Sequence, residues 1–312
     1  MYKRQALIFD ANNLMYRAYH RFNSFTDVSG RPTSVIYGVP FVVEAQVRKF
    51  QPDLVIAVFD GARSKHRLKI CPDYKGSRVQ KLDFDKEDFL RQKEEVMEGL
   101  YNLGVSVVHN PDQEADDMIY SVVKLLQKQR VGTIIIISSD KDFNQLATTK
   151  DVVIYNPHSQ EKITVNTCKH FKGYEAKQTV DYLTLVGDDS DNIKGYPLVG
   201  EKRAQQFLEK YGSIKAFLRG SEISSVVSKN ALQKIYKKNH FLISLRAYHL
   251  KYMRDVKINW YKNQPFPTPN KSLFENYCGA FTLKSFLKNK GFYETFKSLS
   301  QRSIRSRKNN LS

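Results

Sequence analysis

The chain has 312 residues, enough for one large domain or for two that share an interface, and it carries 50 Lys and Arg against 32 Asp and Glu. The resulting formal net charge of +18 favours a polyanionic partner, with nucleic acid as the first candidate. The sequence contains no long apolar span, basic amphipathic anchor or signal-peptide core, which argues against membrane association. Cys71, Cys168 and Cys278 are widely spaced and form no CxxC pair, so we expect neither a disulfide framework nor a structural zinc site.

Short apolar runs that end in a carboxylate mark the first part of the chain. ALIFD ends at Asp10, LVIAVFD at Asp60 and TIIIISSD at Asp140. Runs this short and this apolar are typical of buried strands in a parallel sheet. Helical patterns alternate with these strands, over residues 34–50, 86–103 and 114–130. The alternation predicts a doubly wound α/β sheet.

The remaining segments differ in character. Residues 63–84 are polar and basic, and we expect an exposed, mobile connection there. A pair of strands is predicted at 152–155 and 162–165, with a turn between them through Asn156, Pro157 and His158. Beyond residue 175 helices dominate, and the loop 193–200 opens a helix over 201–211. The basic tail QRSIRSRKNN is expected to be disordered.

Carboxylates are concentrated where these elements meet. Strand ends of an open α/β sheet form its ligand-binding edge, so Asp10, Asp60 and Asp140 are expected there. Two acidic clusters add to them, EADD at 114–117 and GDDSDN at 187–192. Each cluster alone could be a helix start or a turn, where acids are ordinary. Together they would repel one another unless cations neutralise them, and oxygen ligands without His or Cys favour Mg²⁺ or Mn²⁺. Phosphodiester hydrolysis by two cations is the reaction this pattern indicates.

Six ordered motifs carry a family resemblance: FDANNLMYRAYH, VFDG, YKGSR, QEADDMIYS, ISSDKDFNQL and GDDSDNIKGYPLVGEKRA. Over about residues 6–250 the chain resembles the 5′-nuclease domain of bacterial DNA polymerase I and the stand-alone phage flap endonucleases. The resemblance implies a PIN-like doubly wound, mainly parallel sheet with a helical arch and a C-terminal helical subdomain containing a helix-hairpin-helix element. The expected boundaries are an α/β nuclease core at 1–175, with the arch at about 63–104, a duplex-binding subdomain at 176–260 and a basic extension at 261–312. No polymerase follows these motifs, so we expect a free-standing nuclease.

The resemblance also implies roles for individual residues. The first metal ion would be held by Asp10, Asp60, Glu114 and Asp116, and the second by Asp140, Asp142 and Asp188, with Asp116 contributing to both and Asp117 and Asp191 in support. Arg17, Lys75 and Arg78 would contact the phosphate near the cut. Tyr74 would stack on a terminal base, and Lys81 would line the arch together with Arg78, Arg91 and Lys93. Duplex phosphates would be gripped by Gly195, Gly200, Lys202 and Arg203. One departure from the family pattern is Leu198, which stands where a glycine is usual and could push a phosphate or a bound ion away.

The function implied is that of a metal-dependent 5′–3′ exonuclease and structure-specific flap endonuclease. Its expected substrates are DNA with a 5′ flap, a nick or a free 5′ end, with RNA–DNA hybrids as further candidates. We expect two Mg²⁺ ions, replaceable by Mn²⁺, and K⁺ at the helix-hairpin-helix loop. A monomer in the cytoplasm of a bacterium or of a phage-infected host is expected, with replication proteins as candidate partners.

Three other interpretations start from the same residues. A non-catalytic binder of branched DNA on the same fold remains the main alternative. A phosphatase would need an aspartate two residues after Asp10, where Asn12 stands. A PIN-like ribonuclease would normally be shorter and would lack the helix-hairpin-helix region.

Overall fold

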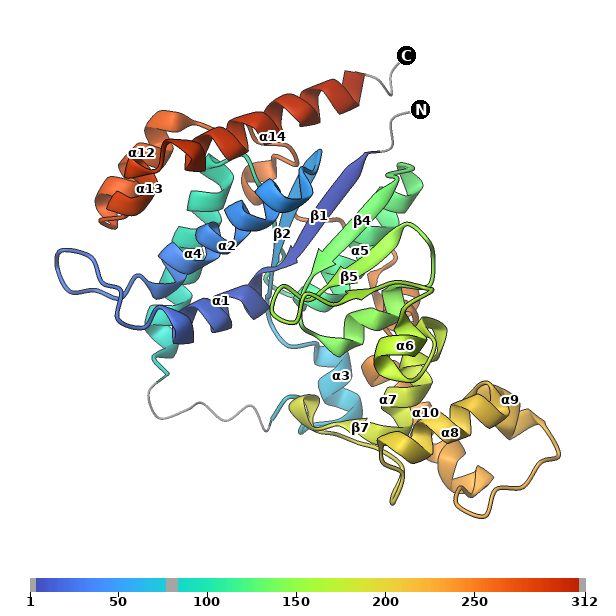
Figure 1. Cartoon of the computed structure of the whole chain (residues 1–312). Helices are drawn as coiled ribbons and strands as arrows, with labels where there is room; N and C mark the ends of the chain where they lie inside the picture. The colour runs from blue at the N-terminus through green and yellow to red at the C-terminus, as the bar shows by residue number, and fades with distance from the viewer. Residues whose placement is uncertain (1–3, 77–83, 309–312) are drawn as a thin grey trace. The chain divides into compact units, whose positions relative to one another are not determined.

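The computed structural model describes residues 4–76 and 84–308 (Figure 1). The chain is divided into two compact units. Unit 1 comprises Met1–Gly61, Asp83–Ser139 and Lys257–Ser312, and unit 2 comprises Ala62–Leu82 and Asp140–Val256. Each unit therefore combines segments that are distant in the sequence. This division differs from the expected boundary at residue 175, because the chain leaves unit 1 once after Gly61 and again after Ser139.

Unit 1 is built on a parallel sheet whose four strands lie in the order β3-β2-β1-β4. Their bounds are β1 (Gln5–Asp10), β2 (Leu54–Phe59), β3 (Ser106–His109) and β4 (Thr133–Ile137). Ile8 of β1 is in register with Ile56 on one side and Ile136 on the other. Helices cover both faces, so side chains on both faces of the strands are buried, which explains their unbroken apolar runs. The parallel sheet is confirmed, and the strand at 106–109, too short to be recognised from the sequence, is added to it.

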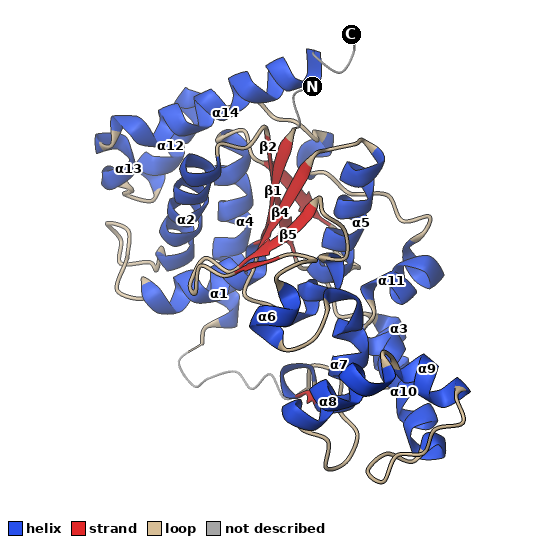
Figure 2. Cartoon of the chain, turned by 45° about the vertical axis from the view of Figure 1, so that its right-hand side comes forward, coloured by secondary structure: helices blue, strands red, loops and turns tan. Residues whose placement is uncertain are grey.

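The helices around this sheet are α1 (Ala11–Arg21), α2 (Ser34–Phe50), α4 (Lys86–Asn102) and α5 (Ala115–Lys128). In Figure 2, α2 and α4 lie to the left of the sheet and α5 to its right. Close packing of α4 against α2 and β3 makes it a core helix of unit 1. The arch expected over about 63–104 therefore does not extend through α4.

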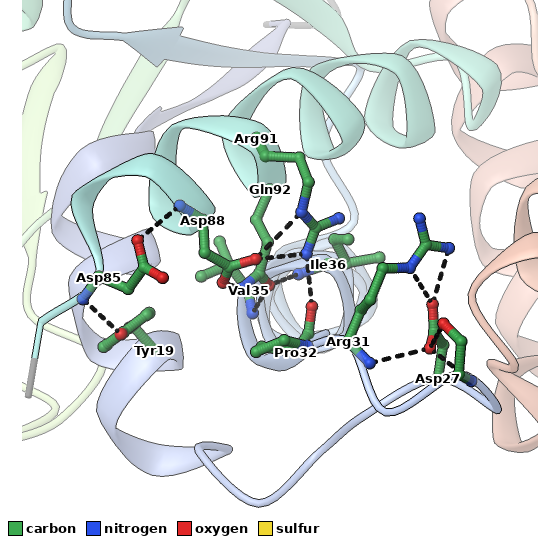
Figure 3. A network of polar contacts seen from close by, with 11 residues as sticks. Tyr19, Asp27, Arg31, Pro32, Val35, Ile36, Asp85, Asp88, Arg91 and Gln92 are labelled. Atoms are coloured by element: carbon green, nitrogen blue, oxygen red, sulfur yellow. Dashed lines mark hydrogen bonds and ion pairs between the residues drawn. The ribbon is translucent and has the colours of Figure 1, made fainter.

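A polar network joins α4 to the start of α2 (Figure 3). The N-cap residue of α2, Thr33, makes no side-chain capping bond, and Gln92 of α4 supplies the missing acceptor. Its Oε1 accepts the backbone N–H of Val35 at 2.8 Å and of Ile36 at 3.3 Å. Gln92 is fully buried and in turn donates to Asp88 at 2.6 Å. The first amides of a helix have no acceptor within the helix, and a distant side chain thus supplies one for two of them at the start of α2.

The C-terminal segment of unit 1 is helical and well packed. It contains η5 (Tyr261–Asn263), α12 (Lys271–Ala280), α13 (Lys284–Lys288) and α14 (Lys290–Lys308). Phe292 and Phe296 of α14 are buried, and the Phe292 ring stacks on Phe286 at 4.1 Å between centroids. Phe286 also stacks on Tyr37 of α2 at 4.9 Å. The expectation of a disordered tail was wrong as far as Lys308, because α14 buries an apolar face despite its many charges.

Unit 2 is mainly helical. It holds α3 (Lys65–Ile70), η1 (Lys141–Leu146), β5 (Val152–Tyr155), β6 (Lys162–Ile163), α6 (Cys168–Lys172), η2 (Ala176–Gln178), α7 (Thr179–Val186), β7 (Gly187–Asp188), η3 (Asp189–Asp191), β8 (Ile193–Lys194), α8 (Glu201–Tyr211), α9 (Ile214–Arg219), α10 (Lys229–Ile243), α11 (Leu245–Tyr248) and η4 (His249–Met253). The predicted pair of strands is confirmed as antiparallel β5 and β6, and the predicted helix at 201–211 as α8.

The start of the connection after β2 is ordered, contrary to expectation. Arg67 of α3 is 2 % exposed, and its Nε donates to the carbonyl oxygen of Leu242 at 3.1 Å. Its guanidinium carbon lies 4.0 Å from the ring centroid of Tyr248, a cation–π contact. These contacts explain how a basic segment becomes part of a packed unit.

Two expectations from composition can be compared with the structure. In the part of the chain that the structure describes, no helix is long and apolar enough to cross a membrane. Cys71, Cys168 and Cys278 are all buried free thiols.

Candidate functional site

The carboxylate that ends β1 is held by hydrogen bonds at the edge of the unit 1 sheet. Asp10 caps α1, and its Oδ1 accepts the backbone N–H of Asn13 at 3.1 Å. Its Oδ2 accepts the hydroxyl of Ser138, just beyond β4, at 2.8 Å. Asp10 is only 6 % exposed, so these bonds set its orientation.

Asp60 follows the neighbouring strand β2, and hydrogen bonds hold both of its carboxylate oxygens and its backbone N–H. Its Oδ1 accepts the backbone N–H of Ala115 at 2.6 Å, and its Oδ2 accepts Nδ2 of Asn12 at 2.9 Å. Its own N–H donates to Oδ1 of Asn12 at 3.3 Å. The bond to Ala115 brings the first turn of α5 to the end of β2. The predicted ligands Glu114, Asp116 and Asp117 thus lie at the edge where Asp10 and Asp60 stand, and Glu114 and Asp117 are buried.

A buried cation lies behind Asp60. Nζ of Lys93 donates to the backbone carbonyl of Asp60 at 2.5 Å and lies 3.1 Å from Nε2 of His109. Burial lowers the pKa of Lys93, and burial together with the Lys93 charge lowers the pKa of His109 to about 4. His109 is therefore neutral near pH 7, and its Nε2 can accept a hydrogen bond from the ammonium of Lys93.

These contacts correct the expectation that Lys93 and Arg91 line an arch. Lys93 is 8 % exposed and directs its ammonium into unit 1. Arg91 pairs with Asp88 at 2.6 Å and donates to the carbonyl oxygen of Pro32 at 2.7 Å (Figure 3). Neither side chain serves as an electrostatic guide for a single strand in this conformation.

The second acidic group lies in unit 2. Asp140 caps η1, and its Oδ1 accepts the backbone N–H of Asp142 at 2.8 Å. Asp188 caps η3 and accepts both the N–H and the hydroxyl of Ser190, at 2.9 and 2.7 Å. The short antiparallel pair β7 and β8 fixes this turn, with Asp188 opposite Ile193.

Burial and charge repulsion both act on the carboxylates of this group. Burial, and then the neighbouring carboxylates, raise the pKa of Asp140 and raise that of Asp142 further still. Lys141 lies 3.4 Å from Asp188, and Lys75 lies 3.9 Å from Asp191, so two cations offset part of the negative charge.

One atom of this group lacks a partner. Oδ1 of Asp142 is buried and receives no hydrogen bond from any described residue. A buried carboxylate oxygen normally accepts a hydrogen bond or binds a cation. Hard oxygen donors without His or Cys fit Mg²⁺ or Mn²⁺ in chemical type.

The two acidic groups belong to different units. Within the described ranges, no three Asp, Glu, His or Cys side chains already form a metal-binding arrangement. The assignment of nine residues as ligands therefore remains a prediction. The supporting residues Asn12, Ser138 and Lys141 were not recognised as such in the sequence, although each lies within two residues of a predicted ligand.

The predicted phosphate-contacting residues have different environments. Arg17 is exposed on α1. Lys75 is 5 % exposed, and its backbone has a φ of 54°. Tyr74 is 2 % exposed, so its ring is not open to a terminal base in this conformation, because it packs beside Arg67 and Lys75. Arg78 and Lys81 lie outside the described residues.

The predicted duplex-binding loop lies in unit 2 between β8 and α8. Gly195 is required sterically, because a Cβ there would lie 2.4 Å from the carbonyl oxygen of Leu185. Gly200 is the N-cap of α8 and, having no side chain, does not cap the first amides of this helix. Lys202 and Arg203 are both exposed in its first turn. This arrangement suits phosphate binding, and the role of these residues remains a prediction.

Comparison with known proteins supplies the family. Residues 5–175 match the model of the 5′-3′ exonuclease N-terminal resolvase-like domain, and residues 174–265 match that of the 5′-3′ exonuclease C-terminal SAM fold. A 5′-3′ exonuclease of Buchnera aphidicola is 29 % identical over 283 residues, covering 88 % of this chain and 97 % of the relative. A 5′-3′ exonuclease of Aquifex aeolicus is 33 % identical over 217 residues, covering 69 % of this chain and 72 % of the relative. The structure of T5 5′-exonuclease with bound zinc aligns with a TM-score of 0.68 at 20 % identity, over 89 % of this chain and 98 % of that one. The chain belongs to the 5′-3′ exonuclease family, a family of nucleases in which a resolvase-like domain is joined to a SAM-like helical domain.

Proposed function

We propose that this protein is a divalent-metal-dependent 5′–3′ exonuclease and structure-specific flap endonuclease. It would hydrolyse phosphodiester bonds at or near the 5′ ends of branched or nicked DNA. The observation that carries the proposal is the buried, unpartnered Oδ1 of Asp142, which lies beside Asp140 in a pair of carboxyl groups whose pKa values are both raised, in a chain of this family. Mg²⁺ is the expected ion, with Mn²⁺ as a substitute.

The predicted ligands fall into two sets. The first ion would be held by Asp10, Asp60, Glu114 and Asp116, and the second by Asp140, Asp142 and Asp188, with Asp116 shared and Asp117 and Asp191 in support. Bound cations would supply an activated water and would stabilise the charge on the leaving oxygen.

The chain's own residues orient these ligands. Asn12 and the amide of Ala115 fix both oxygens of Asp60, and Ser138 orients Asp10. Lys141 and Lys75 offset the charge of the acidic group in unit 2. Arg17, Lys75 and Arg78 are proposed to steady the scissile phosphate.

Several finer features are part of the same proposal. The backbone amides at the start of α8, with Gly195, Gly200, Lys202 and Arg203, would grip duplex phosphates without reading sequence. K⁺ at this loop, RNA–DNA hybrids as further substrates and replication proteins as partners are expected from the family resemblance. A monomer acting in the cytoplasm is the expected state.

Digestion of a 5′-labelled flap substrate with Mg²⁺, and separately in chelator, tests the proposal. We expect the parent protein to cut near the flap junction only when Mg²⁺ or Mn²⁺ is present. Asp116→Asn is expected to abolish nearly all cleavage, to keep flap binding, and to melt no lower than the parent in chelator, because like charges are relieved. Asp112→Asn, a nearby exposed carboxylate outside the ligand sets, is the matched control and should behave as the parent.

Three results would contradict the proposal. Strong cleavage in chelator would show that the reaction does not need a metal ion. Release of nucleotides only from 3′ ends would contradict the proposed 5′ polarity. A less stable but fully active Asp116→Asn protein would reduce this carboxylate to a partner of the α5 dipole. Tight flap binding without cleavage by the parent would favour a non-catalytic binder of branched DNA.

A further inference from the structure

The buried amine of Lys93 connects the ends of two neighbouring strands of unit 1. Lys93 lies on α4, and its Nζ donates to the backbone carbonyl of Asp60, the residue after β2, at 2.5 Å. The same Nζ lies 3.1 Å from Nε2 of His109, the last residue of β3. Lys93 is buried, so water competes little for these contacts. One side chain of α4 thus bonds both strand ends.

The backbone of His109 is held from its other side. Its N–H donates to the carbonyl oxygen of Asn259 at 3.2 Å, and Nδ2 of Asn259 donates to the carbonyl oxygen of His109 at 2.8 Å. The next residue, Trp260, forms an antiparallel bridge with Val108 of β3. The imidazole that faces Lys93 therefore belongs to a strand end that the C-terminal segment of unit 1 keeps in place.

The two strand ends lead directly to predicted ligands of the first metal ion. Asp60 follows β2, and the loop after β3 runs to Glu114 at the start of α5. The N–H of Gly61 donates to the carbonyl oxygen of Gln113 at 2.8 Å, and a Cβ at Gly61 would lie only 2.0 Å from the carbonyl oxygen of Asn110. The backbones after β2 and β3 are therefore in direct contact. A shift of one strand end against the other would move the ligands of this set apart.

The acceptors that Lys93 uses indicate positioning and not charge balance. Both are uncharged atoms, a carbonyl oxygen and a ring nitrogen. A lysine that balances charge pairs with a carboxylate, as Lys141 does with Asp188 at 3.4 Å in unit 2. A buried amine without hydrogen bonds is destabilising, so these two contacts determine where the end of the Lys93 side chain lies.

We propose that Lys93 is a positioning residue for the first metal ion. By bonding the carbonyl of Asp60 and the imidazole of His109, it holds the end of β2 beside the end of β3, and so holds Asp60 beside the first turn of α5. The inference rests on the proposed function, since it takes Asp60 and Glu114 as metal ligands. It gives a role in metal binding to Lys93 and His109, which belong to neither ligand set.

The experiment measures Mn²⁺ binding by electron paramagnetic resonance, in which the signal of free Mn²⁺ is lost on binding. Every protein carries Asp142→Asn, which removes a predicted ligand of the second ion, so that the first set dominates the binding curve. Lys93→Met keeps a long apolar side chain but removes the donor. It should weaken Mn²⁺ binding about tenfold or more, as loss of a residue that orients a metal ligand typically does.

Substitutions of His109 test the other end of the contact. His109→Leu should weaken Mn²⁺ binding as Lys93→Met does. His109→Gln should bind Mn²⁺ nearly as tightly as the parent, because the side-chain oxygen of Gln can still accept a hydrogen bond from Lys93. The double variant Lys93→Met with His109→Leu should bind no more weakly than Lys93→Met alone, since the two residues act as one network.

The matched control is Lys128→Met, the same change at an exposed residue at the far end of α5, and it should leave Mn²⁺ affinity unchanged. Unchanged or tighter binding by Lys93→Met would overturn the proposal, because loss of a cation that acts only by its charge would relieve repulsion of Mn²⁺. Equal weakening by His109→Gln and His109→Leu would also overturn it. Thermal unfolding in chelator shows whether each variant is folded, and the two His109 variants decide the question if Lys93→Met is not.

Flap cleavage with Asp142 intact separates this inference from the proposed function. Lys93→Met should need about tenfold more Mg²⁺ for half-maximal cleavage and should approach the parent's kcat at saturating Mg²⁺. A parent that binds Mn²⁺ and shows these effects on binding, but cuts no flap, would refute the nuclease function alone. A parent that cuts flaps, with unchanged Mg²⁺ and Mn²⁺ dependence in Lys93→Met, would refute the role of Lys93 alone.

Discussion

Replacing Asn12 with alanine tests how the protein positions a predicted metal ligand. The Asn12 amide makes two hydrogen bonds to Asp60, one to the carboxylate at 2.9 Å and one from the backbone N–H at 3.3 Å. A bond to a charged group contributes about 1.5–3 kcal/mol and a neutral one about 1 kcal/mol. Because the site is only partly buried, we take the lower end and expect Asn12→Ala to lose about 2 kcal/mol of unfolding free energy.

The functional effect should be larger than the effect on stability. Without Asn12, Oδ2 of Asp60 loses the amide that donates to it, and the carboxylate is held only through the hydrogen bond from the backbone N–H of Ala115 to Oδ1, so it can turn. Loss of a residue that orients a metal ligand typically reduces metal affinity or activity by about 10–100-fold. We therefore expect the Mg²⁺ concentration for half-maximal flap cleavage to rise by at least about tenfold.

Mg²⁺ titration of flap cleavage, beside thermal unfolding in chelator, measures both effects. Asn13→Ala is the control, since Asn13 lies next in the chain and, among the described residues, its side chain bonds the exposed hydroxyl of Ser139, at 3.0 Å, and not Asp60. The hydrogen bond from the backbone N–H at position 13 to Oδ1 of Asp10 does not involve the side chain, so the substitution keeps it. Equal Mg²⁺ dependence in the two variants would refute the idea that Asn12 orients Asp60.

Two further predictions follow from buried polar groups. Gln92→Leu should lower the unfolding free energy by about 1–3 kcal/mol, because it leaves the buried amides of Val35 and Ile36 without an acceptor, and an unchanged denaturant midpoint would show that another group caps α2. In chelator, the melting temperature should rise as the pH falls from 7 toward 5.5, because the raised pKa values of Asp140 and Asp142 make the folded state take up protons before the unfolded state does. Asp142→Asn should reduce that rise, and identical pH profiles of parent and variant would contradict this explanation.

Much of the unit 1 core could be predicted from the sequence because local pattern and final environment agree there. The apolar runs before Asp10 and Asp60 became strands buried on both faces, and parallel strands end at one edge. Helix α8 was likewise predicted with its observed bounds, since its start signal and apolar spacing are local. The identity of the predicted ligands rests on the same local motifs.

Other features depended on partners far away in the sequence. Lys93 belongs to a charged helix, yet its ammonium is drawn inward by the carbonyl of Asp60, 33 residues earlier. The basic tail is helical to Lys308 because the helix to which it belongs buries Phe292 and Phe296 within unit 1. Arg67 and Tyr74 lie in a segment that reads as an exposed loop, and both are buried.

The features that could be predicted from the sequence and those that depended on distant partners differ for one physical reason. In a strand or helix with a regular apolar period, the local sequence alone indicates which residues are buried. A Lys, an Arg or an aromatic residue in a polar segment can be stable either in water or against a suitable acceptor or ring. Only the tertiary structure decides between these states, because only it brings the carbonyl of Asp60 to Lys93 or the ring of Tyr248 to Arg67.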